Sequence, residues 1–252
     1  MSRADTEAAL PQRGSQSIDQ PRYWWFVARE ELLRQALRGF LGSPERLLDV
    51  GSADGPSVGW LRGDHQHVTI DIDTRGLRRG EGVCASADAM PFPSASFDVV
   101  TAFDVVEHCP SEAAALSEVA RVLRPGGRFL CSVPAYQWTW SDHDVRAGHY
   151  RRYTRRRITD AVERSGLDVQ RATYGFTSVF PFFLAERGLR RVRRIRGSRQ
   201  EEPGDAASIQ PLPDRVSRAL LGLTHVEAQI LARHGLPFGS SVFVAALKPG
   251  GR

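Results

Sequence analysis

The sequence predicts an α/β fold in which helices cover both faces of a doubly wound, mostly parallel sheet. Short apolar runs of strand length alternate with helical segments, which is the order that builds such sheets. The run at 97–103 is almost continuously apolar, as expected for a strand covered on both faces. A glycine-containing loop follows the first run, at the position where open α/β sheets bind ligands. The 252 residues suffice for one such domain with an elaboration.

The composition is that of an ordinary globular chain. Hydrophobic residues make up 41% and charged residues 25% of the sequence, and it contains no apolar run long enough to span a membrane. The first twenty residues lack the apolar core of a secretory signal, so we expect a cytoplasmic protein. Cys84, Cys109 and Cys131 show no CxxC spacing, which argues against a disulfide framework and a thiolate zinc site.

The charge pattern leaves two kinds of partner open. The net charge is +5, and the arginines cluster at 151–157 and at 187–199, so phosphate-bearing partners have to be considered. In the second cluster Leu189, Val192 and Ile195 form an apolar stripe between the arginines. Helices that lie on membrane surfaces and helices that face a core both show this pattern. The pattern therefore allows two interpretations of this segment, which are peripheral membrane contact and a helix that simply faces the core.

The chain begins with a polar segment, 1–20, whose composition predicts a disordered tail. Over 23–40 aromatic and aliphatic residues recur at helical spacing, and the Gly-Ser-Pro sequence at 42–44 ends the pattern. We therefore expect an aromatic helix ahead of the first strand.

The apolar runs that follow define the strands of the sheet. We expect strands over 46–50, 68–72, 82–85, 97–103, 128–133, 168–176 and 240–247. A helix is expected at 58–61, and longer ones over 111–123 and 154–165, with Ser111 and Thr154 as caps of their first turns. This alternation predicts right-handed crossovers between parallel strands.

About sixty residues before the last strand need not belong to the sheet. We assign 21–176 and 237–252 to the main domain and 177–236 to an inserted helical cap. Within the cap, 197–213 has the composition of a flexible linker, and 214–234 is an amphipathic helix. The cap and the aromatic helix are expected to close over the active face together.

The loop after the first strand suits the close approach of a ligand. Its small residues leave room at the backbone, and the helix that follows offers free amides. A dinucleotide fingerprint needs its third glycine at position 56, where this chain has Pro56. Hydride transfer is therefore disfavoured.

The spacing from Gly51 to Gly55, with Ala53 in place of the usual middle glycine, resembles the first motif of class I S-adenosylmethionine-dependent methyltransferases. Further motifs of that family follow in its order between residues 47 and 134. They are Ile70-Asp71, the loop 86–92, the strand start 97–100, Val106-Glu107-His108 and the turn 123–127. The chain is most similar to the group known as type 11. The resemblance implies a Rossmann-like sheet of seven strands, the last antiparallel, with S-adenosylmethionine as the cofactor.

The resemblance also implies which residues hold the cofactor. The candidates are Asp49, Gly51, Ala53, Gly55, Asp71, Asp88, Ala89 and Phe103. Asp71 is expected to accept hydrogen bonds from the ribose hydroxyls, a role for which Asp73 competes, and Asp88 from the adenine amino group. Phe103 and Met90 either sandwich the adenine or belong to the core.

Two aromatic segments, 23–29 and 132–154, resemble a subset of the family that acts on glycan, lipid-linked or natural-product substrates. The second segment lies at the same edge of the predicted sheet as the cofactor. Its His143 and His149 are therefore the candidates for the base that takes a proton from the acceptor, although either could instead only hydrogen-bond the loop.

The acidic and histidine residues of this loop match no established metal-ligand spacing, so we predict no metal site. His108 is expected either near the cofactor or as a cap of the neighbouring backbone. Residues 103–106 lack the Asn/Asp-Pro-Pro-aromatic pattern of base-amino methylation, so nucleic acid is not expected as a substrate.

The sequence as a whole predicts methyl transfer to oxygen, because a histidine base suits hydroxyl chemistry. The expected acceptor is a small-molecule natural product, a glycan or a lipid-linked sugar. Methylation at nitrogen or carbon is the alternative within the enzyme class. A non-catalytic binding protein that keeps the methyltransferase fold is the alternative outside it.

Overall fold

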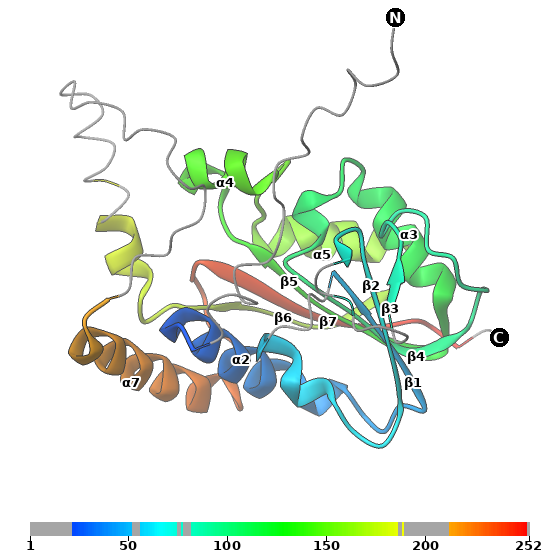
Figure 1. The fold of residues 1–252 in the computed structure, drawn as a ribbon, viewed down its shortest axis with the longest axis horizontal. Coiled ribbons are helices and arrows are strands. Elements are labelled where there is room, and N and C mark those ends of the chain that lie inside the picture. The colour runs from blue at the N-terminus through cyan, green and yellow to red at the C-terminus, as the bar shows by residue number, and fades with distance from the viewer. Residues whose placement is uncertain are drawn as a thin grey trace, which may run out of the picture.

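The computed structural model describes residues 22–51, 56–74, 77, 82–185, 188 and 212–250. In this part of the chain a central sheet lies between two layers of helices (Figure 1). The predicted tail, the second arginine cluster apart from residue 188, and the predicted linker apart from residues 212 and 213 lie outside the described residues.

The described residues form a sheet of seven strands in the order β3-β2-β1-β4-β5-β7-β6. They are β1 (Arg46–Val50), β2 (Gln66–Asp71), β3 (Gly82–Cys84), β4 (Phe97–Phe103), β5 (Leu123–Pro134), β6 (Asp168–Gly175) and β7 (Ser241–Leu247). Neighbours from β3 to β5 pair in parallel, whereas β7 runs antiparallel to both β5 and β6. The predicted doubly wound sheet with an antiparallel last strand is therefore confirmed. Because the strand order reverses between β1 and β4, a ligand crevice is expected at their carboxyl ends.

The helical layers pack on the sheet through two apolar clusters. The helices are α2 (Trp24–Leu37), α3 (Glu112–Val122), α4 (Asp142–Ala147), α5 (Arg155–Arg164) and α7 (Asp214–Leu231), with short 3-10 turns η1 (Arg38–Phe40), η2 (Pro56–Leu61), η4 (Val106–His108) and η5 (Gln137–Thr139). On one face, α3 and α5 contribute Leu116 and Ile158 to the buried core. On the other, α2 and α7 lie side by side and contribute Leu33 and Leu231 (Figure 1). Among the described residues, every helix is too short or too polar to cross a lipid bilayer.

Helix α7, which the sequence analysis assigned to the inserted cap, packs beside α2 on the face of the sheet. His225 Nδ1 lies 2.6 Å from Glu31 Oε1, which ties α7 to α2. Glu227 accepts hydrogen bonds from the amides of Thr177 and Ser178, which tie α7 to the segment after β6. The last helix of the segment 177–236 is therefore part of the outer helical layer, and closure of that segment over the acceptor stays a prediction.

Local signals account for the starts of α3, α4 and α5. Ser111 and Thr154 cap α3 and α5 as predicted, because their side chains accept hydrogen bonds from amides in the first turns. The sequence analysis did not predict α4, although Ser141 and Asp144 form a capping box at its start. β5 begins earlier than expected, because Leu123 pairs with β4 before a register shift interrupts the ladder.

Candidate active site

The glycine that follows β1 shapes the edge where β1 and β2 end. Gly51 has a φ of 69°, in the left-handed region that favours glycine. Its amide donates to the carbonyl of Ile70 at 2.8 Å, which joins the ends of the two strands. A Cβ atom at residue 51 would collide with the side chain of Val105, so the turn requires glycine. Ala53 and Gly55 lie outside the described residues.

Asp71 ends β2 at the same edge. Its side chain is half-buried, and Oδ1 accepts a hydrogen bond from the amide of Asp73 at 2.8 Å. Burial raises the pKa of Asp71, while the hydrogen bond from Asp73 opposes that shift. A partly buried carboxylate gains from additional hydroxyl donors, so its position suits a ribose diol.

Asp49, one residue before the end of β1, is directed into the protein. Its side chain is 1% exposed, and Oδ1 accepts a hydrogen bond from Oγ1 of Thr101 at 2.5 Å. Oδ2 lies 3.9 Å from Nε2 of His67. Asp49 therefore braces β1 against its neighbours β4 and β2, and contact of its side chain with the cofactor stays a prediction.

The candidates after β3 and β4 differ in exposure. Asp88 is half-buried, with Oδ1 accepting from Ser86 Oγ at 2.5 Å, and Ala89 is exposed. Met90 and Phe103 are both buried, but they belong to the apolar clusters on opposite faces of the sheet. The two side chains therefore do not face each other across one ligand, and adenine contact by Phe103 stays a prediction.

The described part of this edge fits S-adenosylmethionine. The turn at Gly51 is left-handed, and its missing Cβ lets the side chain of Val105 pack directly against it. The carboxylate of Asp71 lies at the end of β2 and that of Asp88 follows β3, where they can accept hydrogen bonds from a ribose and from an amino group. The donors of that cofactor would thus meet acceptors of the right kind.

A buried ion pair joins α2 to this edge. Arg29 of α2 is only 8% exposed, and its Nη2 lies 2.7 Å from Oδ2 of Asp104, the residue after β4. Ser132 of β5 donates to Oδ1 of Asp104 at 2.9 Å. The sequence analysis did not identify this network, although an arginine on the apolar face of the aromatic helix was a visible signal. The network fixes α2 against the ends of β4 and β5.

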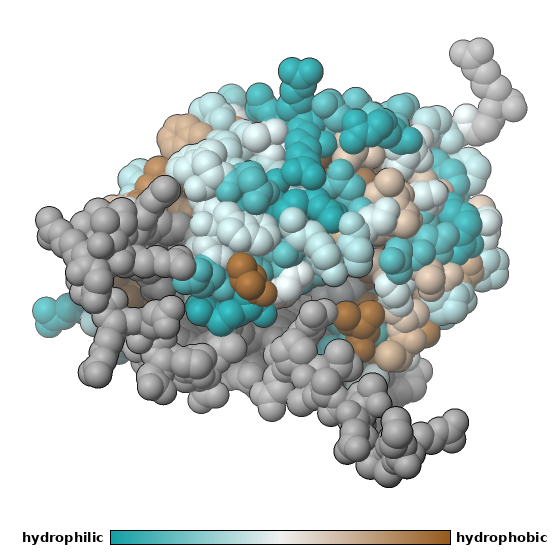
Figure 2. Space-filling model, turned by 90° about the horizontal axis from the view of Figure 1, so that it is seen from above, coloured by the Kyte–Doolittle hydropathy of each residue, from teal (hydrophilic) through white to brown (hydrophobic). Residues whose placement is uncertain are grey.

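Aromatic rings gather where β5 ends. The ring of Tyr136 lies 5.5 Å from that of Trp138, 5.3 Å from that of Tyr174 and 5.6 Å from that of Phe180. Burial, with the hydrogen bond to Tyr174, raises the pKa of Tyr136 to about 12. Trp138 is 65% exposed. Figure 2 looks onto the side of the molecule that carries α4, where hydrophilic side chains predominate among the described residues. Exposed rings on such a surface suit stacking on a sugar or a planar ligand.

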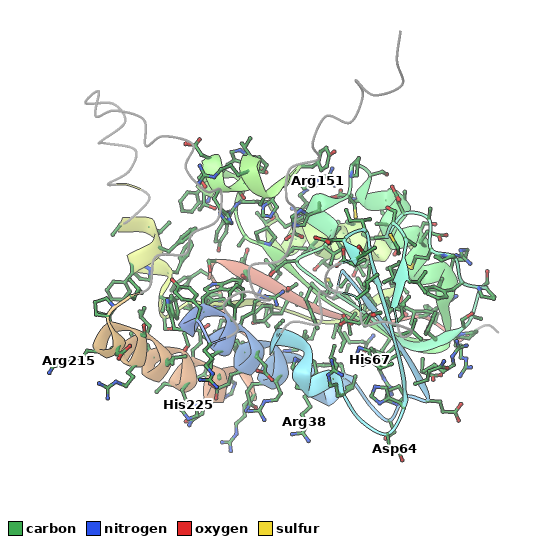
Figure 3. All side chains as sticks on the ribbon, in the orientation of Figure 1. Arg38, Asp64, His67, Arg151, Arg215 and His225 are labelled. Atoms are coloured by element: carbon green, nitrogen blue, oxygen red, sulfur yellow. The ribbon has the colours of Figure 1, made fainter. Side chains whose placement is uncertain are left out.

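Most arginines of the first cluster are engaged within the chain. Arg151, which Figure 3 labels, donates to the backbone carbonyls of Cys109 and Pro110 at 2.8 and 2.6 Å. Arg157 lies 3.7 Å from a carboxylate oxygen of Glu112. Arg152 is buried and bonded to the acid described below. These contacts give Arg151, Arg152 and Arg157 a structural role, whereas Arg155 and Arg156 are exposed.

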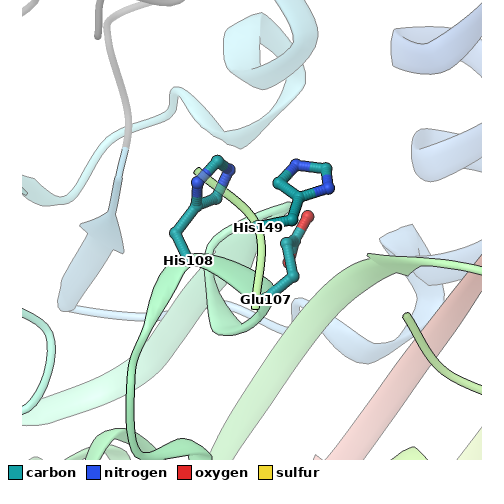
Figure 4. Close-up of side chains that lie close together, drawn as sticks. All are labelled: Glu107, His108 and His149. Carbon is teal, nitrogen blue, oxygen red and sulfur yellow. The ribbon is translucent and has the colours of Figure 1, made fainter. Parts of the chain in front are cut away.

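Glu107, His108 and His149 converge beside the edge (Figure 4). Glu107 and His108 belong to η4, directly after β4, whereas His149 follows α4. One ligand atom from each of the three lies within 4.8 Å of the others. The rings of His108 and His149 meet edge to face with centroids 4.6 Å apart, and the ring of His143 lies 6.3 Å from that of His149. The structure thus brings both predicted histidines to one place and adds Glu107, which the sequence analysis did not select.

Asp144 orients His149. Asp144 is fully buried, and Oδ1 contacts Nδ1 of His149 at 2.9 Å and accepts from Nε of Arg152 at 2.6 Å. Burial alone would raise the pKa of Asp144, but the hydrogen bonds from His149 and Arg152 hold it well below its ordinary value. An ionised Asp144 makes Nδ1 of His149 the donor, so the lone pair of the neutral ring is on Nε2.

Glu107 is a buried carboxyl group without a hydrogen-bond partner among the described residues. Its exposure is 0%, and both carboxyl oxygens are unpaired. Burial, together with the nearby charge of Asp104, raises the pKa of Glu107 well above its ordinary value. The backbone carbonyl of Glu107 accepts from the amide of Tyr150 at 2.8 Å, which holds the His149 segment beside η4. Because such a group is costly to bury, it marks a position where a ligand is expected.

Comparison with known proteins finds a methyltransferase domain in part of the chain. The model of the methyltransferase domain matches residues 48–131, from β1 into β5. A probable S-adenosylmethionine-dependent methyltransferase of Mycolicibacterium smegmatis is 29% identical over 177 residues, covering 65% of this chain and 67% of that protein. The 27-O-demethylrifamycin SV methyltransferase of Amycolatopsis mediterranei is 37% identical over 103 residues, covering 35% of this chain and 38% of that protein. The match thus spans two thirds of the length of the first relative and less than half of the length of the second.

A solved structure shows the same fold. The putative sarcosine dimethylglycine methyltransferase from Galdieria sulphuraria superposes with a TM-score of 0.56 at 13% sequence identity, covering 88% of this chain and 86% of that chain. The family match covers the strands and turns that form the cofactor edge described above. Residues 48–131 therefore carry a methyltransferase domain, and the relatives and the fold support a class I S-adenosylmethionine-dependent methyltransferase.

Proposed function

We propose that this methyltransferase transfers the methyl group to a hydroxyl oxygen of a small-molecule natural product, a glycan or a lipid-linked sugar. The proposal depends on the pair His143 and His149, of which Asp144 orients His149 at the acceptor side of the edge. Imidazole is the side chain best suited to take a hydroxyl proton near neutral pH. The relative from Amycolatopsis mediterranei is named for methylation of 27-O-demethylrifamycin SV, which favours oxygen as the acceptor atom.

The cofactor, when bound, supplies a methyl group on a positively charged sulfur, and the carbon–sulfur bond breaks with its electron pair left on sulfur as the oxygen–carbon bond forms. The proton of the hydroxyl goes to His149 or to His143. On His149 the receiving atom is Nε2, because Nδ1 donates to Asp144, whose charge then stabilises the protonated ring. His143 is exposed on α4, so it can pass a proton on to water.

On the cofactor side, the proposal assigns the methionine portion to the backbone of residues 51–55, which include Ala53 and Gly55. Asp71 holds the ribose, and Asp88 with Ala89 binds the adenine edge. The positive φ of Gly51 and the position of Asp71 at the end of β2 support this assignment.

On the acceptor side, the exposed ring of Trp138 and its neighbour Tyr136 offer a stacking surface. Such rings bind the apolar faces of sugars and planar ring systems. We therefore expect hydroxylated aromatic compounds, macrolides and glycosides to be the productive acceptors.

The test begins with a panel of such acceptors, in which a product is detected by the mass of one added methyl group. His143→Gln and His149→Gln are then assayed separately across pH, with the exposed residue His234 replaced in a His234→Gln control. Free imidazole titrates near pH 6.5, so loss of the base should remove the acidic limb of the profile and lower turnover by about 10²- to 10⁴-fold.

Two outcomes would contradict the proposal. If both variants keep turnover within about threefold of the parent, a barrier change of only ~0.7 kcal/mol, neither histidine is the base. A product that carries the new methyl group on nitrogen or carbon, as located by NMR, would exclude oxygen as the acceptor.

A further inference from the structure

We propose that Glu107, His108 and His149 form a binding site for a divalent transition-metal ion beside the cofactor edge. The sequence analysis predicted no metal site, because two ligands adjacent in sequence and a third from another element match no linear motif. The inference rests on the proposed function only for the identity of the molecule that fills the remaining coordination position.

The three ligand atoms already lie close together. They are within 4.8 Å of one another, and they come from two segments that a backbone hydrogen bond between Tyr150 and Glu107 holds together. A tetrahedral ion with ligands at about 2.1 Å separates its ligand atoms by about 3.4 Å. The side chains therefore need to close by about 1.4 Å at most, and His108 is the exposed member of the three, whereas Glu107 is buried.

Glu107 provides an independent indication of a bound ligand. Its carboxyl group is completely buried, points into the cluster (Figure 4) and has no hydrogen-bond partner among the described residues. Buried carboxyl groups are normally paired, hydrogen-bonded or bound to metal. A cation held with the two imidazoles would satisfy the oxygen that the protein leaves unpaired.

Asp144 stands where the outer shell of such a site is expected. It contacts Nδ1 of His149 at 2.9 Å, which fixes the ring and leaves Nε2 for the ion. Metal-binding histidines usually donate their second nitrogen to a carboxylate in this way. Arg152, at 2.6 Å from the same oxygen, keeps Asp144 ionised and in place.

The donor set selects the class of metal. Two imidazole nitrogens and one carboxylate suit Zn²⁺, Co²⁺, Mn²⁺ or Fe²⁺ better than Mg²⁺ or Ca²⁺, which prefer sites made of oxygen alone. Three protein ligands leave a coordination position open. An acceptor hydroxyl in that position loses its proton more readily. Because the ion then occupies Nε2 of His149, the proton goes to His143, whose ring is 6.3 Å from that of His149.

The site is tested by cobalt binding to the full chain. After treatment with a chelator and dialysis, Co²⁺ is titrated into the protein without acceptor, and its visible absorption is followed and then competed with Zn²⁺. We expect one saturable Co²⁺ per chain. His108→Gln, His149→Gln and Glu107→Gln should each weaken Co²⁺ binding by at least tenfold, and Asp144→Asn by about 10- to 100-fold.

The controls separate a built site from adventitious binding. His143→Gln removes the neighbouring histidine outside the ligand set, and His234→Gln removes an exposed one, so both should bind Co²⁺ as the parent does. His108 is exposed, so His108→Gln leaves the core intact even if Glu107→Gln were to unfold the chain. Calorimetric titration with S-adenosylmethionine checks that each variant is folded.

The proposal is overturned if the parent shows no saturable Co²⁺ spectrum, or if His108→Gln binds Co²⁺ as tightly as His234→Gln. Neither result bears on the acceptor atom, because the titration contains no acceptor. Conversely, a product methylated on nitrogen or carbon would overturn the proposed function and leave the cobalt titration unaffected.

Discussion

The two halves of the active edge are built in different ways. The cofactor half, at the ends of β1 and β2, depends on backbone geometry, above all the left-handed turn at Gly51 and its hydrogen bond to Ile70. The acceptor half depends on side chains from separate elements that bind one another, as Asp144, His149 and Arg152 do. The first kind of site leaves a motif in the sequence, whereas the second becomes visible only in the fold.

The same difference predicts where single substitutions cost most. In the acceptor half, charged groups are buried against each other, so removing one leaves another uncompensated. In the cofactor half, a substitution disturbs a turn and its ligand contacts but leaves no buried charge without its partner. Substitutions in the acceptor half should therefore affect stability more, and those in the cofactor half should affect binding more.

The largest effect is expected for Asp144→Ala. Arg152, which is only 5% exposed, would keep its charge without its partner, which typically costs about 3–5 kcal/mol of the free energy of unfolding. Denaturant unfolding measures this loss. The matched control is Asp160→Ala, which breaks a surface pair with Arg156 and should cost about 0.5 kcal/mol or less. Equal losses in the two variants would show that the Asp144 network is no more important than a surface pair.

The next largest effect is expected for Gly51→Ala. A Cβ atom there collides with Val105 and forces a side chain into the left-handed region, so the free energy of unfolding should fall by about 2–3 kcal/mol and cofactor binding should be lost. Gly222→Ala is the control, because nothing lies within 4 Å of its added Cβ on α7. That change should instead stabilise the chain by about 0.5–1 kcal/mol. If the Gly51→Ala variant binds the cofactor and is as stable as the parent, the cofactor half does not depend on the backbone geometry of this turn.

A smaller effect is expected from pH. The pKa of Asp144 is held below that of the unfolded chain, so its network contributes fully above the unfolded value of about 3.9 and is lost as pH falls toward the lower folded value. The difference in unfolding free energy between the parent and Asp144→Asn should therefore be constant from about pH 7 to pH 5 and shrink below about pH 4. A difference that stays constant down to pH 3 would rule out this linkage.

The smallest effect concerns thiol labelling. Cys84, at the end of β3 in the cofactor half, is exposed, whereas Cys109, beside the acceptor half, is buried. Burial raises the pKa of Cys109 to about 11, with the charge of Glu107 adding to the shift, and burial raises that of Cys131 as well. A maleimide at pH 8 should modify one of the three cysteines in the native chain and all three in denaturant, as counted by mass spectrometry. Rapid labelling of Cys109 would show that water reaches the interior behind Glu107.

The sequence predicted the sheet well because its signals are local. The strands at 46–50 and 97–103 have the predicted bounds, since each apolar run ends at a residue with positive φ, Gly51 or Asp104. The sequence did not predict α4, because six residues are too few to show a helical period. Its capping box was the remaining signal. The position of α7 was not predicted, because amphipathic spacing shows that one face of a helix is covered but does not show which element covers it.

The candidate site was predicted in part for the same reason. Gly51 follows β1 directly and Asp71 is the last residue of β2, so position alone indicates their place at the edge. Glu107 reads in the sequence as a charged surface residue, and its burial depends on elements that are distant in the chain. The pair of Arg29 and Asp104 spans 75 positions, a separation at which no sequence pattern indicates contact.

The most direct test of the account is calorimetric titration of S-adenosylmethionine into the parent, Asp71→Ala and His149→Gln. The parent should bind, and Asp71→Ala should bind more weakly by about 1.5–3 kcal/mol for each lost charge-assisted hydrogen bond, roughly ten- to hundredfold. His149→Gln, which lies in the acceptor half, should bind as the parent does. Equal affinity of the parent and Asp71→Ala, or an equal loss in both variants, would contradict the division of the edge into a cofactor half and an acceptor half.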